Sequence, residues 1–187
     1  KTGIKGVIWV TAPNLEITKI ILVDSARIQE EDAERANKHK FSKHEPALPL
    51  YELVDVEKTI PLFQNVQTDK WIEIDKTTAC RFRYNGHILG ACFIELRING
   101  EILVFSGDIG REDDSLLYPP KKPERADLLF IESTYGNRIH PKDGEEQLTS
   151  LIKKACTKNG TIIIPGFAVE RTQLLMYTLW SLRKKTL

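Results

Sequence analysis

The stretch Cys92-Phe-Ile-Glu-Leu-Arg-Ile-Asn-Gly-Glu-Ile-Leu-Val-Phe105 carries the strongest structural signal in this sequence of 187 residues. Two β-rich runs flank Asn99-Gly100, a dipeptide that predicts a tight turn between the two strands of a hairpin. Working upstream from it, residues 71–74 and 80–84 have the same strand-like composition. We therefore expect strands to dominate the middle of the chain.

Before these strands the sequence predicts two helices. A β-rich run at residues 6–10 leads into Thr11-Ala-Pro13, which combines an N-cap residue with a proline in the first turn. A long helix is therefore expected from about Pro13 and reaches as far as Asn37. Asp55 is interpreted as the cap of a second, short helix that ends before Asn65.

Strands and helices alternate in the last third of the chain. Residues 128–131 and 161–164 are continuous apolar runs of the kind found in strands covered on both faces. Between them, a capping-box pattern that starts at Asp143 opens a helix, which Asn159-Gly160 closes. From Phe167 a further helix is expected to run to the end. The predicted fold class is therefore α/β, or mixed α+β in layers.

The composition is that of a soluble globular chain, because 41% of its residues are hydrophobic and 28% are charged. The 27 Lys and Arg residues balance 26 Asp and Glu residues, which leaves a net charge of +1. No general positive field would attract nucleic acid, so any such contact must be local. No apolar run is long enough to span a membrane. Cys80, Cys92 and Cys156 form no CxxC pair, so we expect a reducing, cytoplasmic location.

Three polar residues stand where strands are expected to end, each beside flexible glycines. They are His87 in Asn85-Gly-His-Ile-Leu-Gly90, Asp108 in Phe105-Ser-Gly-Asp-Ile-Gly-Arg111, and Glu132 in Phe130-Ile-Glu-Ser-Thr-Tyr-Gly136. Loops at strand ends commonly carry catalytic groups, and a His with a carboxylate suits a divalent metal such as zinc. Each motif by itself is weak, because a His after a strand is more often a surface or hydrogen-bonded residue.

Together, the order and spacing of these motifs resemble the metallo-β-lactamase superfamily and, within it, the β-CASP branch of nucleic-acid-processing nucleases. The matching stretches are Gly86-His-Ile-Leu-Gly-Ala91, Phe105-Ser-Gly-Asp-Ile-Gly-Arg111, Glu132-Ser-Thr-Tyr-Gly136 and Ile164-Pro-Gly-Phe-Ala-Val-Glu-Arg-Thr-Gln173. Residues 22–32 and 43–51 look most like prokaryotic members. The resemblance implies that residues 1–136 are the C-terminal-side portion of a metallo-β-lactamase αβ/βα sandwich and that residues 137–187 begin a β-CASP domain.

In that family two zinc ions are bound by a His-x-His-x-Asp-His loop, a later His, a bridging Asp and a final His. Carried across, His87 is the later His and Asp108 the bridging carboxylate, while Glu132 is the acidic residue that orients a catalytic His. The implied reaction is attack on an RNA phosphodiester by a metal-activated hydroxide. The His-x-His-x-Asp-His motif does not occur in this sequence. It is expected just upstream of Lys1, so the chain alone is expected to be inactive.

Three arginines that follow the motifs, Arg111, Arg138 and Arg171, are candidate RNA contacts, with surface ion pairs as the alternative. Pro165-Gly166, expected at a strand end and followed at once by a helix, would present free backbone N–H groups to a phosphate. Here the sequence departs from the family, which usually has Gly at the position of Glu170. An acidic side chain beside a phosphate path would repel the substrate.

The other histidines are assigned no metal. His39 and His44 are five residues apart, which fits no regular zinc pair. His140 neighbours Arg138 in a loop that could face substrate.

The implied substrate is single-stranded RNA, no membrane partner is expected, and the protein could form a homodimer. Two other interpretations remain open. One is a hydrolase of a small ester or thioester, against which Glu132-Ser-Thr-Tyr-Gly136 and Arg171-Thr-Gln173 argue. The other is a non-catalytic scaffold subunit of an RNA-processing complex, against which the presence of His87, Asp108 and Glu132 argues.

Overall fold

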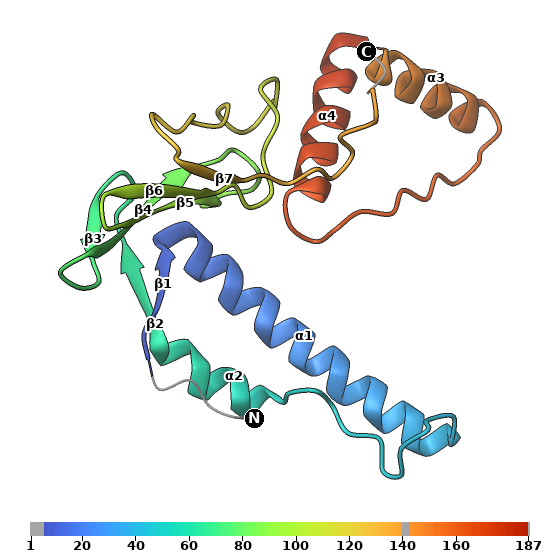
Figure 1. Ribbon diagram of the computed structural model, residues 1–187. Coiled ribbons are helices and arrows are strands. Elements are labelled where there is room, and N and C mark those ends of the chain that lie inside the picture. Colours follow the sequence, from blue (N-terminus) through green and yellow to red (C-terminus); the bar gives the residue numbers. More distant parts are fainter. Residues whose placement is uncertain (1–5, 140–142, 187) are drawn as a thin grey trace.

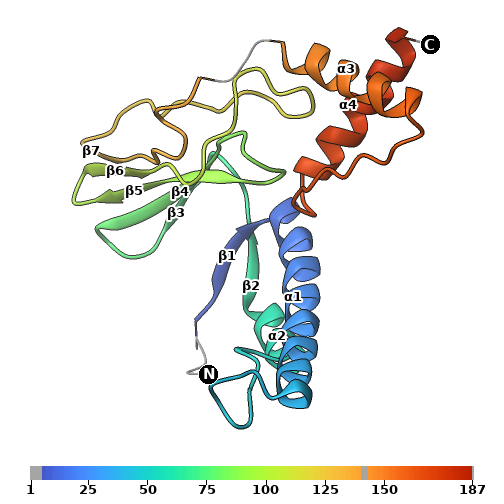
Figure 2. The same ribbon diagram turned by 90° about the vertical axis from the view of Figure 1, so that its right-hand side faces the viewer.

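The structure is a computed structural model that describes residues 6–139 and 143–186. Within these residues it contains four α-helices, a short 3-10 helix and two sheets (Figures 1 and 2). In chain order the elements are β1 (Ile8–Thr11), α1 (Ala12–His39), α2 (Leu53–Thr59), η1 (Ile60–Leu62), β2 (Phe63–Val66), β3 (Trp71–Glu73), β4 (Thr78–Tyr84), β5 (Cys92–Ile98), β6 (Glu101–Phe105), β7 (Leu128–Phe130), α3 (Gly144–Thr157) and α4 (Arg171–Thr186). The predicted mixed α+β class is confirmed, and the arrangement is consistent with a partial αβ/βα sandwich.

The larger sheet has the strand order β3-β4-β5-β6-β7. Strands β3 to β6 pair antiparallel in sequence order, whereas β7 runs parallel to β6. The turn between β5 and β6 has left-handed backbone at both Asn99 (φ 51°) and Gly100 (φ 88°). A turn of this hand matches the right-handed twist of the strands it joins. The predicted hairpin is therefore confirmed.

The smaller sheet pairs β1 with β2 in parallel. The long helix α1 starts directly after β1, and α2 packs against α1 before the chain returns through η1 to β2 (Figure 1). Pro13 stands in the first turn of α1, where a missing backbone N–H costs no helical hydrogen bond. Thr11 is the N-cap residue, but its hydroxyl makes no bond to the helix and instead donates to the carbonyl oxygen of Gly90 (2.8 Å).

The start of α2 and the segment after it differ from expectation. Glu52 is the N-cap residue, and Asp55 is the third helical residue, so the assignment of Asp55 as the cap is wrong. The two carboxylates form a reciprocal capping box, each accepting a hydrogen bond from the backbone of the other residue. The predicted short helix also ends earlier, because Phe63–Val66 forms β2 and pairs with the distant β1.

The last third of the chain differs most from expectation. The predicted strand at residues 128–131 forms as β7, but Leu128 is 51% exposed and Phe130 49% exposed, so it is not covered on both faces. Residues 161–164 form no strand, and no described strand pairs with them. Helix α4 begins at Arg171 and not at Phe167. An apolar run alone therefore did not make a strand, because a strand also needs a partner for its backbone groups.

Helix α3 begins after Asp143 and ends before Asn159-Gly160, as the sequence predicts. The Asp143 carboxylate makes no hydrogen bond to the helix backbone and accepts one from the side-chain amide of Gln147 (3.0 Å). The predicted capping box with Glu146 is therefore wrong. None of the helices in the described ranges is both long and apolar enough to cross a membrane.

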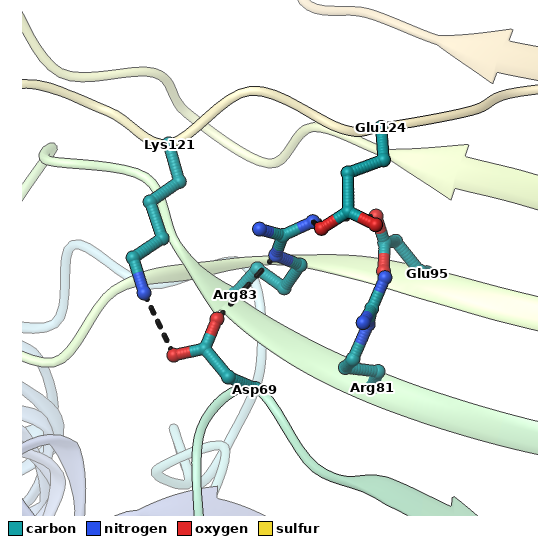
Figure 3. Close-up of polar contacts among 6 residues, drawn as sticks. All are labelled: Asp69, Arg81, Arg83, Glu95, Lys121 and Glu124. Carbon is teal, nitrogen blue, oxygen red and sulfur yellow. Dashed lines mark hydrogen bonds and ion pairs between the residues drawn. The ribbon is translucent and has the colours of Figure 1, made fainter.

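One face of the larger sheet holds a buried carboxylate. Glu95 on β5 is 0% exposed and stands directly opposite Arg81 on β4. Its two oxygens form ion pairs with Arg81 and with Arg83 (Figure 3). Phe93 and Val104, which are almost fully buried, share this face with Glu95. A buried charge costs several kcal/mol unless it is paired, so the two guanidinium groups make this arrangement stable.

We expect Glu95→Ala to lower the free energy of unfolding by about 3 to 5 kcal/mol, because the largely buried Arg81 and Arg83 each lose an ion pair with this carboxylate. The matched control is Glu73→Ala on the same face, where Glu73 is 65% exposed and pairs with Arg97. Loss of that exposed pair should cost less than about 1 kcal/mol. Urea unfolding of both variants would test this, and equal losses would contradict it.

Candidate functional site

Three turns meet at one edge of the larger sheet because of the strand directions. Strands β4 and β6 are both antiparallel to β5, so their carboxyl ends lie at the same edge, and β7 ends there too because it is parallel to β6. The turns that follow these strands carry His87, Asp108 and Glu132 respectively. The topology thus brings together residues that are 21 and 24 positions apart in the sequence.

His87 and Asp108 lie within a side chain's reach of each other. The distance from His87 Nε2 to Asp108 Oδ2 is 3.7 Å. The His87 side chain is 37% exposed and that of Asp108 is 72% exposed, so solvent and ions can reach both groups. Imidazole nitrogen and carboxylate oxygen are common zinc ligands. The pair has the chemistry of part of a metal site.

Asn85 holds the two turns together, and sequence reasoning did not single it out. Its side chain is 2% exposed, and its Nδ2 donates to the carbonyl oxygens of Ser106 (3.0 Å) and Asp108 (2.8 Å). Its Oδ1 accepts from the backbone N–H of His87 (3.3 Å). The Asn85-Gly86 dipeptide was a recognisable turn signal, but nothing local indicates that the amide binds a second turn.

Glu132 lies beside Asp108 at the end of the adjacent strand. Its Oε1 accepts from the backbone N–H of Ile109 (2.6 Å), and its own N–H donates to the hydroxyl of Ser106 (3.0 Å). The hydrogen bond from Ile109 is the main reason that the pKa of Glu132 is lowered, with further contributions from Thr134 and His87. Glu132 therefore fixes the turn that carries Asp108.

Two of the glycines in these turns are required by close backbone contact. A Cβ on Gly110 would lie 1.9 Å from the carbonyl oxygen of Gly86, and the Gly110 N–H donates to the carbonyl oxygen of Asn85 (2.9 Å). A Cβ on Gly90, which has φ +84°, would lie 2.7 Å from the backbone nitrogen of Asn14. The glycines let the turns carrying His87 and Asp108 touch each other and the start of α1.

In the described residues, none of the three candidate arginines forms a hydrogen bond or ion pair with His87. Arg111 pairs with the neighbouring Asp113 (3.0 Å) and is exposed. The Arg138 guanidinium lies over the ring of Tyr135, 5.0 Å from its centre. Arg171 is the first residue of α4. Arg111 therefore forms a surface ion pair, which was the alternative to an RNA contact.

The segment before α4 also differs from expectation. Because α4 begins at Arg171, Pro165-Gly166 is not followed at once by a helix, and the predicted phosphate site at a helix N-terminus is wrong. Pro165, Gly166 and Phe167 instead line an open pocket with Arg171. Burial and the neighbouring Asp114 carboxylate raise the pKa of Glu170, and His87 opposes that shift. The Glu170 carboxyl group and the His87 imidazole therefore interact electrostatically.

The histidines assigned no metal lie elsewhere. His44 is in the loop after α1, whereas the His87 turn touches the first turn of α1, and the 28 residues of this helix span about 42 Å. His140 is outside the described residues. In the described ranges no group of three or more His, Cys, Asp or Glu side chains could hold a metal ion. A closed or catalytic zinc site needs three or four ligands, so His87 and Asp108 fit zinc only as part of a larger set.

Comparisons with known proteins give related sequences, although no family model matches. The chain is 26% identical over 183 residues to ribonuclease TTHA0252 of Thermus thermophilus. It is 30% identical over 193 residues to endoribonuclease YSH1 of Candida glabrata, and 30% identical over 190 residues to cleavage and polyadenylation specificity factor 73 of Drosophila melanogaster. These matches cover 97 to 100% of this chain but 38%, 24% and 25% of the three relatives. The chain therefore spans well under half the length of these relatives.

We expect Gly110→Ala to destabilise the protein by about 3 kcal/mol, since overpacking against a backbone cannot be relieved by a side-chain rotation. Gly144→Ala is the control, because nothing lies within 4 Å of a Cβ there and the residue opens α3. That change should leave stability unchanged or raise it by up to about 1 kcal/mol. Thermal and urea unfolding would measure both. A fully stable Gly110→Ala protein would contradict the contact between the turns.

Glu132 should make the candidate site sensitive to acid. Its pKa is lowered in the folded state, so its contribution to stability is present above its unfolded pKa of about 4.3 and is lost as pH falls through the lower folded value. Thermal unfolding between neutral and acidic pH should show a steeper acid loss for the wild type than for Glu132→Gln, whose amide oxygen can still accept from Ile109. Parallel curves would contradict this assignment.

Proposed function

We propose that this chain is part of a hydrolase of the β-CASP metallo-β-lactamase type that cleaves RNA phosphodiester bonds, because its sequence is similar to those of RNA-processing nucleases. The observation that carries the proposal is the 3.7 Å approach of His87 and Asp108 at one sheet edge. The names of the relatives, a ribonuclease and an endoribonuclease, support RNA as the substrate. Residues 1–136 would form the nuclease-domain portion and residues 137–187 the start of the β-CASP domain.

In this proposal His87 and Asp108 would hold zinc together with a His-x-His-x-Asp-His segment that this sequence does not contain. Two zinc ions would supply Lewis acidity and lower the pKa of water at the scissile phosphate. Asp108 would contribute negative charge that favours cation binding at this site. Because two ligands cannot complete a zinc site, the 187-residue chain alone would not cleave RNA.

The remaining residues have supporting roles. Glu132 holds the Ile109 N–H and therefore keeps Asp108 at the sheet edge. Arg111, Arg138 and Arg171 would contact phosphates of single-stranded RNA, and such contacts position a strand without reading its sequence. Glu170 would oppose the approach of a phosphate as long as its carboxyl group is ionised.

We expect Asp108→Asn, made in the longer protein that contains this chain, to lower the rate of RNA cleavage about a thousandfold, which corresponds to roughly 4 kcal/mol. The amide is nearly isosteric with the carboxylate but neutral, so it weakens binding of both cations. The fold should persist, because the Asp108 side chain is 72% exposed and Asn85 holds only its backbone carbonyl. Cleavage of labelled single-stranded RNA with added zinc, beside a thermal melt, is the measurement.

His44→Ala is the control for this experiment. We expect its cleavage rate to stay within a few fold of the wild type, since His44 lies near the other end of α1. Near-normal activity of Asp108→Asn would overturn the metal assignment. If a folded His44→Ala protein has lost activity, then His44 has a role in cleavage and the assignment of the metal-binding role to His87 alone is wrong.

A further inference from the structure

We propose that Arg83 is a positioning residue for the candidate site, an inference that rests on the proposed function. Residues 118–124, here named the strap, are part of the long loop between β6 and β7. Figure 3 shows Lys121 and Glu124 of the strap beside Asp69 and Arg83. Arg83 attaches the strap to the sheet, and the strap in turn packs on the turn that carries His87.

The first link is a set of ion pairs centred on Arg83, whose side chain is 11% exposed. Its Nη1 lies 3.4 Å from Glu95 Oε1 and 3.1 Å from Glu124 Oε1, and its Nε lies 3.4 Å from Asp69 Oδ1. Asp69 Oδ2 is 2.7 Å from Lys121 Nζ. One guanidinium therefore contacts the buried carboxylate of the sheet and a carboxylate of the strap. The planar, forked shape of arginine allows this, and a lysine ammonium would not reproduce it.

The second link joins the strap to the end of β4. The backbone N–H of Lys121 donates to the carbonyl oxygen of Tyr84 (3.1 Å), and the hydroxyl of Tyr84 donates to the carbonyl oxygen of Tyr118 (3.1 Å). These two bonds hold the strap over the last residue of the strand. Because β4 ends at Tyr84, the strap lies where the turn to His87 begins.

The third link is direct packing of the strap on that turn. A Cβ on Gly86, which has φ +73°, would lie 3.0 Å from the carbonyl oxygen of Tyr118 and 3.1 Å from the backbone nitrogen of Pro120. On its other side, the Gly86 carbonyl meets Gly110 of the turn that carries Asp108. Gly86 is thus enclosed between the strap and the Asp108 turn, and His87 is the next residue. Loosening the strap frees one side of this enclosure.

The Asp69 carboxylate in this network is kept in its charged form by the cations beside it. A hydrogen bond from Lys121 is the main cause of the lowered pKa of Asp69, with Arg83 adding to the effect. A network that only stabilised the sheet would change the melting temperature without changing the His87 turn or the chemical step. The experiment must therefore read out the turn and the reaction separately.

The test uses the longer protein and combines hydrogen exchange with steady-state cleavage of single-stranded RNA. In Arg83→Gln we expect the backbone amides of Lys121, His87 and Ala91 to exchange about tenfold faster, because local opening becomes easier. The kcat should fall about tenfold with KM within about twofold, as for a group that acts on the reacting geometry and not on substrate binding. Amides in α1 should not change.

Two adjacent lysines supply a comparison that does not threaten folding, since Arg83→Gln itself could unfold the protein. Lys121 pairs with Asp69 at 2.7 Å, whereas Lys122 is 83% exposed and pairs only weakly with Glu112 at 3.6 Å. We expect Lys121→Met to speed exchange at the His87 turn and to lower kcat, each about threefold, as loss of one partly exposed ion pair allows. Lys122→Met should match the wild type, and Lys121→Arg should restore both values.

Equal exchange at the His87 turn in folded Lys121→Met and Lys122→Met proteins would overturn the inference. Faster exchange with an unchanged kcat would overturn it too, because the strap would then have no effect on the reaction. If the wild-type protein cleaves no RNA, the proposed function fails, and the exchange data still decide whether the strap orders the His87 turn.

Discussion

The contact between the backbones of Gly86 and Gly110 is the constraint on which the candidate site depends. These two residues belong to different turns, and a single added methyl group would place a carbon 1.9 Å from a carbonyl oxygen. The contact brings His87, one residue beyond Gly86, to Asp108, two residues before Gly110. Asn85 and Glu132 then hold the same two turns through hydrogen bonds to backbone groups. The geometry therefore depends on main-chain packing more than on the exposed side chains.

Charge has two different roles in the molecule. Within the sheet, Glu95 is buried between Arg81 and Arg83 and contributes stability only because all three groups are present. At the sheet edge, Asp108 is 72% exposed and makes one long contact with His87. Inside the sheet the buried carboxylate is paired with two guanidinium groups, whereas the exposed pair keeps its capacity to bind something else. Arg83 connects the two regions through the strap.

Where the sequence-based expectations failed, the missing information was long-range. Residues 161–164 are apolar and β-branched, yet they form no strand because no described strand pairs with them. Residues 63–66 include polar side chains and still form β2, because β1, which is far away in the sequence, pairs with them. Asp143 has the residue type of a helix cap, but its carboxylate binds Gln147 instead. Pattern and propensity describe what a segment can do, and pairing selects among those possibilities.

The sequence by itself determined the local features, which depend on residues adjacent in the chain: the Asn99-Gly100 hairpin, the start of α1 close to Pro13, and the motifs around His87, Asp108 and Glu132. Four motifs in one order also predicted a resemblance to nucleases that process nucleic acid. The tertiary structure alone decided that Asn85 binds the Asp108 turn, that Thr11 binds Gly90 and not its own helix, and that the strap packs on Gly86. Those contacts join residues far apart in the chain, and their energies depend on burial and close approach, which exist only after the strands have paired.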